Sequence, residues 1–334
     1  MKYIGHLDHA DPFYGFLKEH IWPQIGDSSH LHFSVHVLRG SNQVFLYTDE
    51  KSGVSVIGKF FYGLFERAYN VAAGYLTKEW EALEHFRALG FDKPPFYVPK
   101  PLGRSYDINC ALVEEYCPGT TFSDVLKAGA HGHPNRLYRR LSVLADFLAK
   151  LHNKTAISSQ RVDFNEERHY AVTLVNHLRK KNLVHNEEAE SFYHLIAKWA
   201  EKEVMWQDNR VLVHGDATPA NFLFRNHTEI VAIDLEKSHY SDRLFDIGRI
   251  IGEIKHAFLV ERNDSLISEP FIGHFLWQYC THFPHREDAF QAITRRLPFY
   301  VAITMLRIAR NSWVNSEHRK KLLDQAFLNF HHQG

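Results

Sequence analysis

The sequence predicts an α+β fold in two lobes: a small antiparallel-sheet lobe with one key helix, followed by a larger, mainly helical lobe. Three β-rich segments with short connections lie within residues 33–61, which is typical of an antiparallel meander. A helical pattern follows at 77–90, and most of the remaining chain has the apolar spacing of amphipathic helices. The chain has 334 residues, enough for about two domains. We therefore expect an N-terminal lobe at residues 1–115 and a C-terminal lobe at residues 116–334.

Four segments of the first lobe have the β-branched and aromatic composition of strands: 33–39, 43–48, 54–61 and 110–117. The helix at 77–90 is expected to begin at Thr77, which can cap its first turn, and to stop at Gly90. Residues 98–103, V-P-K-P-L-G, are expected to form a loop.

The second lobe is predicted to be helical around a short stretch of strands. One amphipathic helix is indicated by the leucines Leu137, Leu141, Leu144, Leu148 and Leu151. Residues 165–205 fit two helices separated near Asn182 and Asn186. Short strands are expected at 211–213, 222–224 and 229–233, and the chain after Asp246 is expected to be largely helical.

The composition excludes several classes of protein. Lys plus Arg and Asp plus Glu both total 39, so bulk electrostatic binding to nucleic acid or to an acidic membrane surface is not expected. No run approaches the roughly 18 apolar residues of a membrane span, and the polar start of the chain does not resemble a secretory signal. The three cysteines have no metal-ligand spacing and are expected to be reduced thiols, so we expect a cytoplasmic protein.

The most informative segment is V-L-V-H-G-D-A-T-P-A-N-F-L-F at 211–224. Asn221 lies five residues after Asp216, and Asp234 lies thirteen residues after Asn221. This layout is typical of a kinase catalytic loop, in which one Asp handles the acceptor hydroxyl while an Asn and a second Asp hold magnesium. Amide and carboxylate oxygens suit such a hard cation, and a positioned base contributes roughly 10²–10⁴-fold to the rate. The spacing therefore predicts phosphoryl transfer from a nucleotide, with Asp216 as the catalytic residue.

The chain resembles the aminoglycoside phosphotransferase and choline kinase superfamily, whose members are small-molecule kinases related to protein kinases. The resemblance rests on H-G-D-x-x-x-x-N at 214–221, on F-D-I-G-R at 245–249 and on the I-D-L-E that begins at Ile233. The run from 233 to 253 is also close to a pattern of choline and ethanolamine kinases. The resemblance implies a two-lobed protein-kinase-like fold, in which the first lobe binds the nucleotide and the second lobe carries catalysis and acceptor binding.

The same resemblance implies roles for residues around the catalytic loop. Asp234 corresponds to the metal-binding Asp of D-F-G in protein kinases, and Asn221 is the other metal ligand. His214 supports the catalytic loop from within, and Asp246 holds the loop by hydrogen bonds. For Glu236 three roles stay open: contact with a second metal, contact with the acceptor, or simple solvation.

The first lobe should cover the phosphates and receive the base of the nucleotide. Gly40, Ser41 and Asn42 lie between two expected strands, where they can turn sharply and present backbone N–H groups to phosphate. They also resemble the G-x-S-N loops of the phosphotransferase family. The segment L-V-E-E-Y-C-P-G at 112–119 resembles the hinge that receives adenine, which would place the Glu115 carbonyl and the Cys117 amide against the base.

A lysine of the first lobe should contact the α- and β-phosphates. Lys59 is the only Lys within the third expected strand, where kinases place this residue. Its partner should be a glutamate on the helix that follows. Glu79 fits best because Leu83 and Phe86 would then face inward, and Glu81 is the competitor.

The acceptor is expected to be a small molecule. The chain lacks a G-x-x-x-x-G-K-[ST] loop and also lacks the H-R-D, D-F-G and A-P-E of typical protein kinases. Several aromatic residues of the C-terminal segment could cage a quaternary ammonium or could simply form helix core: Phe271, Phe275, Trp277, Tyr279, Phe283, Phe299, Tyr300 and Trp313. The segment has few acidic clusters and several bases, which makes a polycationic aminoglycoside less attractive: Arg295, Arg296, Arg307 and Arg310.

We therefore expect the reaction ATP + R–OH → R–O–phosphate + ADP, with Mg²⁺ as the metal. The acceptor would be a sugar, an amino alcohol or an aminoglycoside-like compound. One alternative is a choline or ethanolamine kinase. Another, of a different class, is a catalytically silent nucleotide-binding scaffold on a kinase fold. The sequence leaves the acceptor open, and it does not decide between ATP and GTP.

Overall fold

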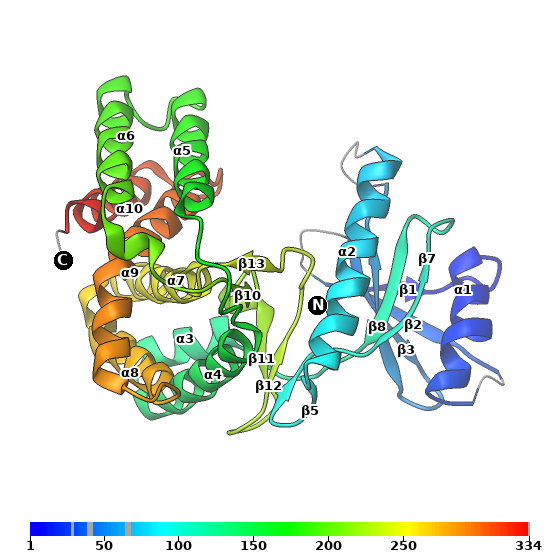
Figure 1. Ribbon diagram of the computed structural model, residues 1–334. Coiled ribbons are helices and arrows are strands. Elements are labelled where there is room, and N and C mark those ends of the chain that lie inside the picture. Colours follow the sequence, from blue (N-terminus) through cyan, green and yellow to red (C-terminus); the bar gives the residue numbers. More distant parts are fainter. Residues whose placement is uncertain (28–29, 39–42, 64–67, 333–334) are drawn as a thin grey trace. The chain divides into compact units, whose positions relative to one another are not determined.

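The computed structural model describes residues 1–27, 30–38, 43–63 and 68–332. The chain forms two compact units: Met1–Gly119 with Val231–Lys237, and Thr120–Ile230 with Ser238–Gly334. The first unit contains an antiparallel sheet and the second is mainly helical (Figure 1), which confirms the predicted α+β class. The structure contains no helix, among the residues it describes, that is long and apolar enough to cross a membrane.

A six-stranded sheet forms the centre of the first unit, and every neighbouring pair in it is antiparallel. In spatial order its strands are β1 (Lys2–His6), β2 (Phe33–Leu38), β3 (Gln43–Asp49), β4 (Ser55–Phe60), β8 (Ala111–Glu115) and β7 (Pro101–Ser105). The strands predicted within 33–61 and 110–117 are confirmed. The prediction of a loop at 98–103 is partly wrong, because β7 begins at Pro101. Proline is tolerated there because β7 lies at the edge of the sheet.

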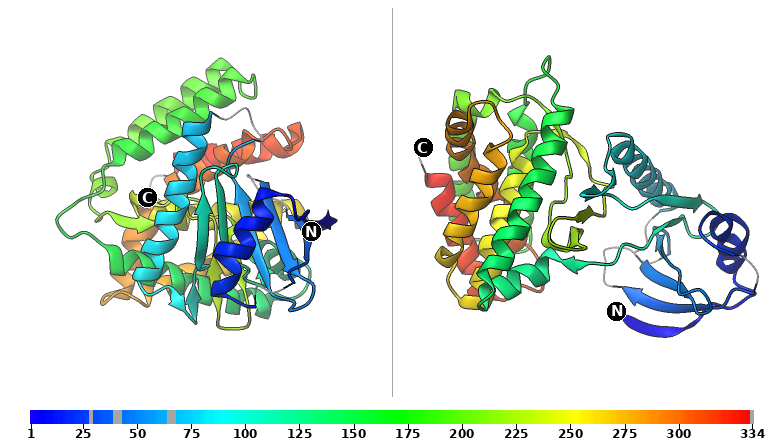
Figure 2. Two further views of the ribbon diagram at one scale, coloured as in Figure 1. Left: turned by 90° about the vertical axis from the view of Figure 1, so that its right-hand side faces the viewer. Right: turned by 90° about the horizontal axis from the view of Figure 1, so that it is seen from below.

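One face of this sheet is covered by a helical segment near the N-terminus (Figure 2). The segment consists of α1 (Pro12–Phe16), η1 (Leu17–Ile21) and η2 (Trp22–Gln24). The Asp11 carboxylate accepts a hydrogen bond from the backbone N–H of Phe13 at 2.8 Å and so caps α1. Buried aromatic and aliphatic residues of the segment and of the strands form one core, which includes Phe13, Leu17, Trp22, Phe33, Val56 and Val113.

The helix α2 (Tyr69–Ala88) lies against β7 and β8 (Figure 1). It begins eight residues before the predicted start, so the prediction that Thr77 caps it is wrong. The Thr77 hydroxyl instead donates to the Ala73 carbonyl at 2.9 Å, as threonines inside helices do. Leu83 and Phe86 are fully buried, as expected. A short ribbon follows, formed by β5 (Asp92–Lys93) and β6 (Phe96–Tyr97).

The second unit contains most of the helices. They are α3 (Phe122–Ala130), α4 (Pro134–Thr155), α5 (Phe164–Lys180), α6 (Asn186–Ala200), α7 (Leu244–Arg262), α8 (Glu269–Cys280), α9 (Arg286–Ala309) and α10 (Ser316–His331), with the short turns η3 (Glu203–Trp206), η4 (Pro219–Asn221) and η5 (Leu266–Ser268). The two helices predicted within 165–205 are confirmed as α5 and α6, which pack side by side (Figures 1 and 2). Between them Asn182 adopts a left-handed conformation with φ of 54°.

Short strands frame the catalytic segment within the second unit. β10 (Val211–Val213) pairs with β13 (His239–Ser241), and β11 (Phe222–Phe224) pairs with β9 (Thr120–Thr121). β12 (Ile230–Ala232) leads the chain back into the first unit, which holds the residues up to Lys237. The strands predicted at 211–213, 222–224 and 229–233 are therefore confirmed.

Helices α7 and α9 approach closely because α7 carries two glycines at the contact. A Cβ added to Gly248 would lie 2.3 Å from the Cβ of Tyr300, and one added to Gly252 would lie 2.4 Å from Cγ2 of Thr304. Both partners lie on α9, so a side chain at either glycine would force the two helices apart. This contact sets the position of α7, whose first turn carries Asp246.

We expect Gly248→Ala to reduce the free energy of unfolding by about 1–3 kcal/mol, because the added methyl overpacks the contact with Tyr300. The matched control is Gly273→Ala in α8, where an added Cβ meets nothing within 4 Å. That change should be neutral or stabilising by up to about 1 kcal/mol through helix propensity. Urea unfolding followed by circular dichroism measures both, and equal effects would contradict this account of the α7–α9 contact.

Candidate active site

The predicted catalytic loop is held by a buried carboxylate. Asp246 is fully buried in the first turn of α7 and accepts hydrogen bonds from two backbone N–H groups of the loop. The His214 N–H lies 2.6 Å from its Oδ2, and the Gly215 N–H lies 3.0 Å from its Oδ1. Gly215 has a φ of 79°, a conformation that glycine adopts without strain, and this lets the loop turn at Asp216. The loop is thus tied to α7 through both oxygens of one side chain.

A buried histidine and a tyrosine complete the hydrogen bonding of Asp246. His152 at the end of α4 has its Nε2 3.3 Å from Oδ2 of Asp246 and its Nδ1 2.9 Å from the Tyr279 hydroxyl. Burial lowers the pKa of His152, so the ring is neutral at pH 7, donates through Nε2 and accepts from Tyr279. Burial alone would raise the pKa of Asp246, but its hydrogen bonds from His152 and from the backbone outweigh burial and lower the pKa. Asp246 is therefore a stable anion.

Asp216 follows the residues that Asp246 holds, and its own backbone organises the next turn. The Asp216 carbonyl accepts hydrogen bonds from the Thr218 N–H at 2.6 Å and from the Asn221 side-chain amide at 2.9 Å. Because Nδ2 of Asn221 donates to this carbonyl, its Oδ1 is the atom available to a cation. The side chain of Asp216 is 18% exposed, so it is accessible from solvent. His214 is fully buried, with its ring 5.1 Å from that of Phe222.

An arginine of α7 contacts the predicted catalytic carboxylate. Nη1 of Arg249 donates to the Gly215 carbonyl at 2.7 Å and lies 3.2 Å from Oδ1 of Asp216. Arg249 is 5% exposed, and its guanidinium lies over the ring of Phe245 at 4.7 Å. One turn further along α7, Glu253 forms an ion pair with Arg307 of α9. Burial raises the pKa of Glu253, and the charge of Asp216 raises it further, so the two carboxylates are neighbours.

The nucleotide-side residues predicted for the first unit gather around Lys59. Its Nζ lies 3.0 Å from Glu79, 3.1 Å from Glu114 and 2.7 Å from Asp234. Of the two glutamates left open by the sequence, Glu79 forms the ion pair, whereas Glu81 is on the exposed side of α2. Burial alone would lower the pKa of Lys59, but the three carboxylates raise it well above its ordinary value. The ammonium is therefore permanently charged.

Asp234 and Glu236 bring further negative charge to this cluster. Asp234 has a φ of 59°, which is uncommon for a residue with a side chain and marks a position where local strain is tolerated. One oxygen from each of Glu79, Asp234 and Glu236 lies within 4.8 Å of the others, so the three side chains could hold a metal ion. The Glu236 side chain is 8% exposed, which argues against the solvated alternative. Burial and the neighbouring Glu79 raise the pKa of Glu236 to about 8, and burial raises that of Glu114 to about 7.

The structure does not test the other predicted nucleotide contacts. Gly40, Ser41 and Asn42 lie outside the residues that the structure describes. Glu115 ends β8, and its carboxylate accepts a hydrogen bond from the Tyr97 hydroxyl at 2.5 Å. Cys117 is buried two residues further on. The assignment of their backbone groups to adenine stays a prediction.

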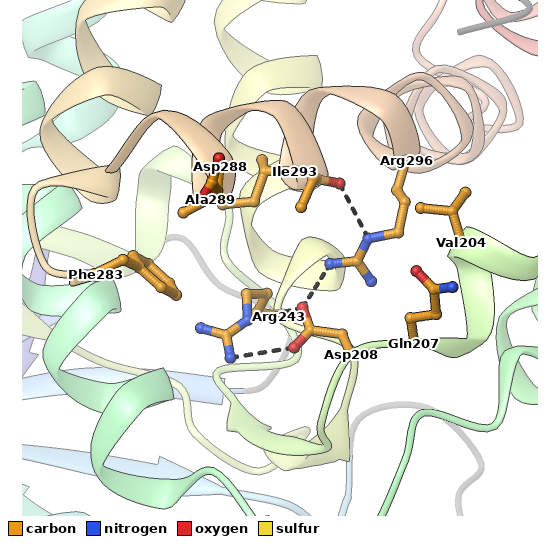
Figure 3. Close-up of a pocket in the computed structure, with 10 residues that line it drawn as sticks. Val204, Gln207, Asp208, Arg243, Phe283, Asp288, Ala289, Ile293 and Arg296 are labelled. Carbon is orange, nitrogen blue, oxygen red and sulfur yellow. Dashed lines mark hydrogen bonds and ion pairs between the residues drawn. The ribbon is translucent and has the colours of Figure 1, made fainter. Parts of the chain in front are cut away.

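A cavity of about 320 Å³ in the second unit is lined by charged residues that already satisfy one another (Figure 3). Asp208 forms ion pairs with Arg243 at 3.0 Å and with Arg296 at 2.5 Å, and Arg296 also pairs with Asp242 at 2.6 Å. The Arg243 guanidinium donates to the Tyr279 hydroxyl as well, at 3.3 Å. This cluster therefore braces the start of α7 against α9, and each of its four charges has a partner of opposite sign.

The aromatic residues of the C-terminal segment are mostly core. Phe271, Phe275, Phe299, Tyr279 and Tyr300 are buried. Trp277 carries Arg286 over its ring at 3.6 Å, and Phe283 carries Arg243 at 5.2 Å. Trp313 is 67% exposed, with the ring of His256 at 5.9 Å. The buried aromatic residues therefore form helix core. Within the part of the chain that the structure describes, these aromatic residues do not form a cage for a quaternary ammonium group.

Comparison with known structures confirms the fold. The ternary complex of streptomycin, ATP and APH(2″)-IIa is 14% identical, covers 97% of this chain and 99% of that one, and gives a TM-score of 0.60. Plasmodium vivax ethanolamine kinase is 13% identical over 89% of this chain and 80% of its own, with a TM-score of 0.57. Amicoumacin kinase in complex with AMP-PNP, Ca²⁺ and Ami is 18% identical over 95% and 91%, with a TM-score of 0.59. The fold is therefore the predicted protein-kinase-like one.

The family follows from the sequence itself. Residues 36–280 match the phosphotransferase enzyme family, and the chain belongs to this family. It is therefore a small-molecule phosphotransferase, as predicted. No curated protein sequence gives a significant match.

Several residues of the site were not predicted from the sequence. Glu114 follows a run of apolar residues in β8, and an acidic residue in such a strand was the available signal. In the sequence Arg249 is only the last residue of F-D-I-G-R, and His152 only follows the last leucine of the stripe in α4. Their contacts with Asp216 and Asp246 join residues far apart in the chain, which local patterns do not reveal.

We expect Asp246→Asn to reduce the free energy of unfolding by about 3–5 kcal/mol at pH 7, because the amide NH2 cannot accept the hydrogen bond that one of the two carboxylate oxygens accepts, and the buried anion is lost. The carboxylate has a lowered pKa in the folded protein, so its stabilisation is present above the unfolded pKa of about 3.9 and is lost as the pH falls through the folded value. The difference between the two proteins should therefore narrow below about pH 4.

Urea unfolding at a series of pH values measures this difference. The control is Asp324→Asn, which removes an exposed partner of Lys320 and should change stability by less than about 0.5 kcal/mol. A destabilisation by Asp246→Asn that stays constant from pH 7 to pH 3 would show that the charge of Asp246 has no part in holding the loop.

Proposed function

We propose that this protein transfers the γ-phosphoryl group of ATP to a hydroxyl group of a small molecule, with Mg²⁺ as the metal. The observation that carries the proposal is the catalytic loop, in which Asp246 fixes two consecutive backbone N–H groups immediately before Asp216. Phosphoryl transfer needs little covalent help from the protein and depends on positioning and charge stabilisation. A carboxylate held by a rigid loop, with its end accessible to solvent, meets the first of these needs.

In this proposal Asp216 orients the acceptor hydroxyl and accepts its proton as the bond to phosphorus forms. In the loose transition state the bond from the attacking oxygen to phosphorus is only slightly formed, so the hydroxyl proton is transferred late and orientation matters more than strong basicity. The ion pair with Arg249 limits the rotation of the Asp216 side chain. Asp246, His214 and His152 act through the loop and do not touch the reacting atoms.

Asn221 and Asp234 are the proposed magnesium ligands. The donor set fits a hard cation, because Oδ1 of Asn221 is a neutral oxygen and Asp234 contributes a carboxylate that is 32% exposed. When bound, Mg²⁺ would neutralise charge on the phosphate oxygens. Glu236, buried near Asp234, is a further oxygen donor for a cation in this role.

Lys59 is proposed to bind the phosphates, with Glu79 as its positioning partner. The ammonium now contacts three carboxylates, and nucleotide phosphates would replace part of that negative environment. The segment with Gly40, Ser41 and Asn42 would cover the phosphates, while the Glu115 carbonyl and the Cys117 amide would receive the base. We further propose a cytoplasmic enzyme, because no disulfide joins its three buried cysteines.

We expect Asp216→Asn to lower kcat by about 10²–10⁴-fold while leaving nucleotide affinity nearly unchanged, since Asp216 meets the acceptor and not the nucleotide. Asp234→Asn should lower kcat and also weaken Mg²⁺-dependent binding of AMP-PNP, because it removes a charged metal ligand. Coupled assays of ADP release and isothermal titration with AMP-PNP, with and without Mg²⁺, measure the two effects. Near-normal turnover by Asp216→Asn, or equal nucleotide affinity in all three proteins, would contradict these assignments.

A further inference from the structure

We infer that the acceptor is an uncharged hydroxyl compound, such as a sugar or a polyol, and that Arg249 excludes cationic acceptors from the position next to Asp216. The inference rests on the proposed function, because it concerns the molecule whose hydroxyl meets Asp216. It separates the acceptors that the sequence left open: sugars on one side, and choline, ethanolamine and aminoglycosides on the other.

One residue on α7 places a cation beside Asp216. The catalytic loop from His214 to Asn221 contains no Lys or Arg. The cation next to the loop is therefore Arg249 of α7. Its Nη1 lies 3.2 Å from the Asp216 carboxylate and 2.7 Å from the Gly215 carbonyl. Its guanidinium is 5% exposed and also lies within 3.4 Å of the Tyr170 hydroxyl, so it is fixed in place. A guanidinium stays protonated at any physiological pH.

Three described carboxylates of the second unit, Glu253, Glu167 and Asp246, are already compensated. Glu253 forms an ion pair with Arg307. Glu167 is buried and accepts from the Ser241 hydroxyl, and burial raises its pKa to about 8, so it is mostly neutral at pH 7. Asp246 is fully buried and is used by the loop and by His152. A cation that approaches Asp216 would therefore meet the charge of Arg249 without an unpaired carboxylate in return.

An aromatic ring could bind a cationic acceptor in place of a carboxylate, but the three rings considered next already carry arginines. The ring of Phe245 lies on α7 close to the loop, but Arg249 itself covers one of its faces at 4.7 Å. A quaternary ammonium would have to compete with the guanidinium for that face. Trp277 and Phe283 likewise already carry arginines, as described above. These three rings therefore do not support cation–π recognition of choline.

A neutral hydroxyl compound is not repelled by Arg249 and does not compete with arginines for an aromatic face. One hydroxyl can donate to the Asp216 carboxylate, and adjacent hydroxyls can accept from cationic donors or donate to paired carboxylates such as Glu253. Hydroxyls do both without a net charge that Arg249 would repel. The arrangement thus favours a polyhydroxylated acceptor over an amine of the same size.

The test compares acceptors that differ in charge and little in shape. 3,3-Dimethylbutan-1-ol is matched with choline, D-glucose with D-glucosamine, and pools of neutral hexoses, pentoses and polyols with pools of aminoglycosides and amino alcohols. The assay is ADP release with Mg²⁺ and ATP at fixed ionic strength. We expect kcat/KM for the neutral member or pool to exceed that of its cationic counterpart by at least about tenfold, since like charges in contact cost several kcal/mol.

Variants of Arg249 show whether its charge sets this preference. Arg249→Gln should reduce the neutral-to-cationic ratio of kcat/KM by about tenfold or more. Arg249→Lys, which keeps the charge, should preserve the ratio even if overall turnover falls, so the ratio reports charge and not packing. The control is Arg295→Gln on the exposed side of α9, which should leave the ratio and the turnover unchanged. Thermal unfolding establishes that each variant is folded.

Three outcomes would count against the inference. A preference of the wild-type protein for the cationic pool would overturn it while leaving phosphoryl transfer intact. An unchanged ratio in folded Arg249→Gln would overturn the role of Arg249. Transfer to neither pool, in protein that binds AMP-PNP with Mg²⁺, would overturn the proposed function, and the inference would fall with it.

Discussion

The hydrogen bonds that the Asp246 carboxylate accepts from His214 and Gly215 hold the catalytic loop of the second unit in place. Both oxygens of one fully buried side chain are used to fix two consecutive peptide groups, so the direction of the chain at Asp216 is set by the first turn of α7. The position of α7 in turn depends on its close contact with α9 at Gly248. Because buried anions are costly unless hydrogen-bonded, the surrounding His152 and Tyr279 are part of the same device.

The second constraint on the structure is that its buried charges are paired with charges of opposite sign. In the first unit one lysine, Lys59, contacts three carboxylates. The pKa values of Glu114 and Glu236 are raised, so these two carboxyl groups are partly protonated and the negative charge around Lys59 is reduced. In the second unit Asp208 and Asp242 are matched by Arg243 and Arg296. Breaking such pairs leaves buried charges uncompensated, which is why single substitutions there should be costly. The cluster at Lys59 is the less balanced of the two, and it is the one expected to receive a metal and phosphates.

Much of the fold could be predicted from the sequence because its elements have strong local patterns. The meander at 33–61, the two helices within 165–205 and the strands around the catalytic loop were recognised from period and turn residues alone. The start of α2 was not, because Thr77 looks like a capping residue yet bonds to a carbonyl within the helix. The segment at Pro12–Gln24 was missed because its short helical turns have no long amphipathic repeat.

The candidate site could be predicted only in part, for a physical reason. Asp216, Asn221 and Asp234 lie close in sequence, with a spacing that is typical of a kinase catalytic loop. The residues that tune them come from distant elements: Arg249 from α7, His152 from α4 and Glu114 from β8. Those contacts depend on how helices and strands pack, which no local pattern encodes. The pairing of Lys59 with Glu79 could be predicted, because it depends only on one strand, one helix and the direction of the buried face of that helix.

Phosphorus NMR on the wild-type protein tests the central claim most directly. The protein is incubated with Mg²⁺, ATP and a combined pool of neutral hexoses, polyols, amino alcohols and aminoglycosides, and the ³¹P spectrum is followed over time. The account predicts that the γ-phosphate resonance of ATP declines while a phosphomonoester resonance rises in equal amount, with little inorganic phosphate. An unchanged ATP spectrum, or conversion of the γ-phosphate to inorganic phosphate alone, would contradict the claim that this chain transfers phosphate to an alcohol.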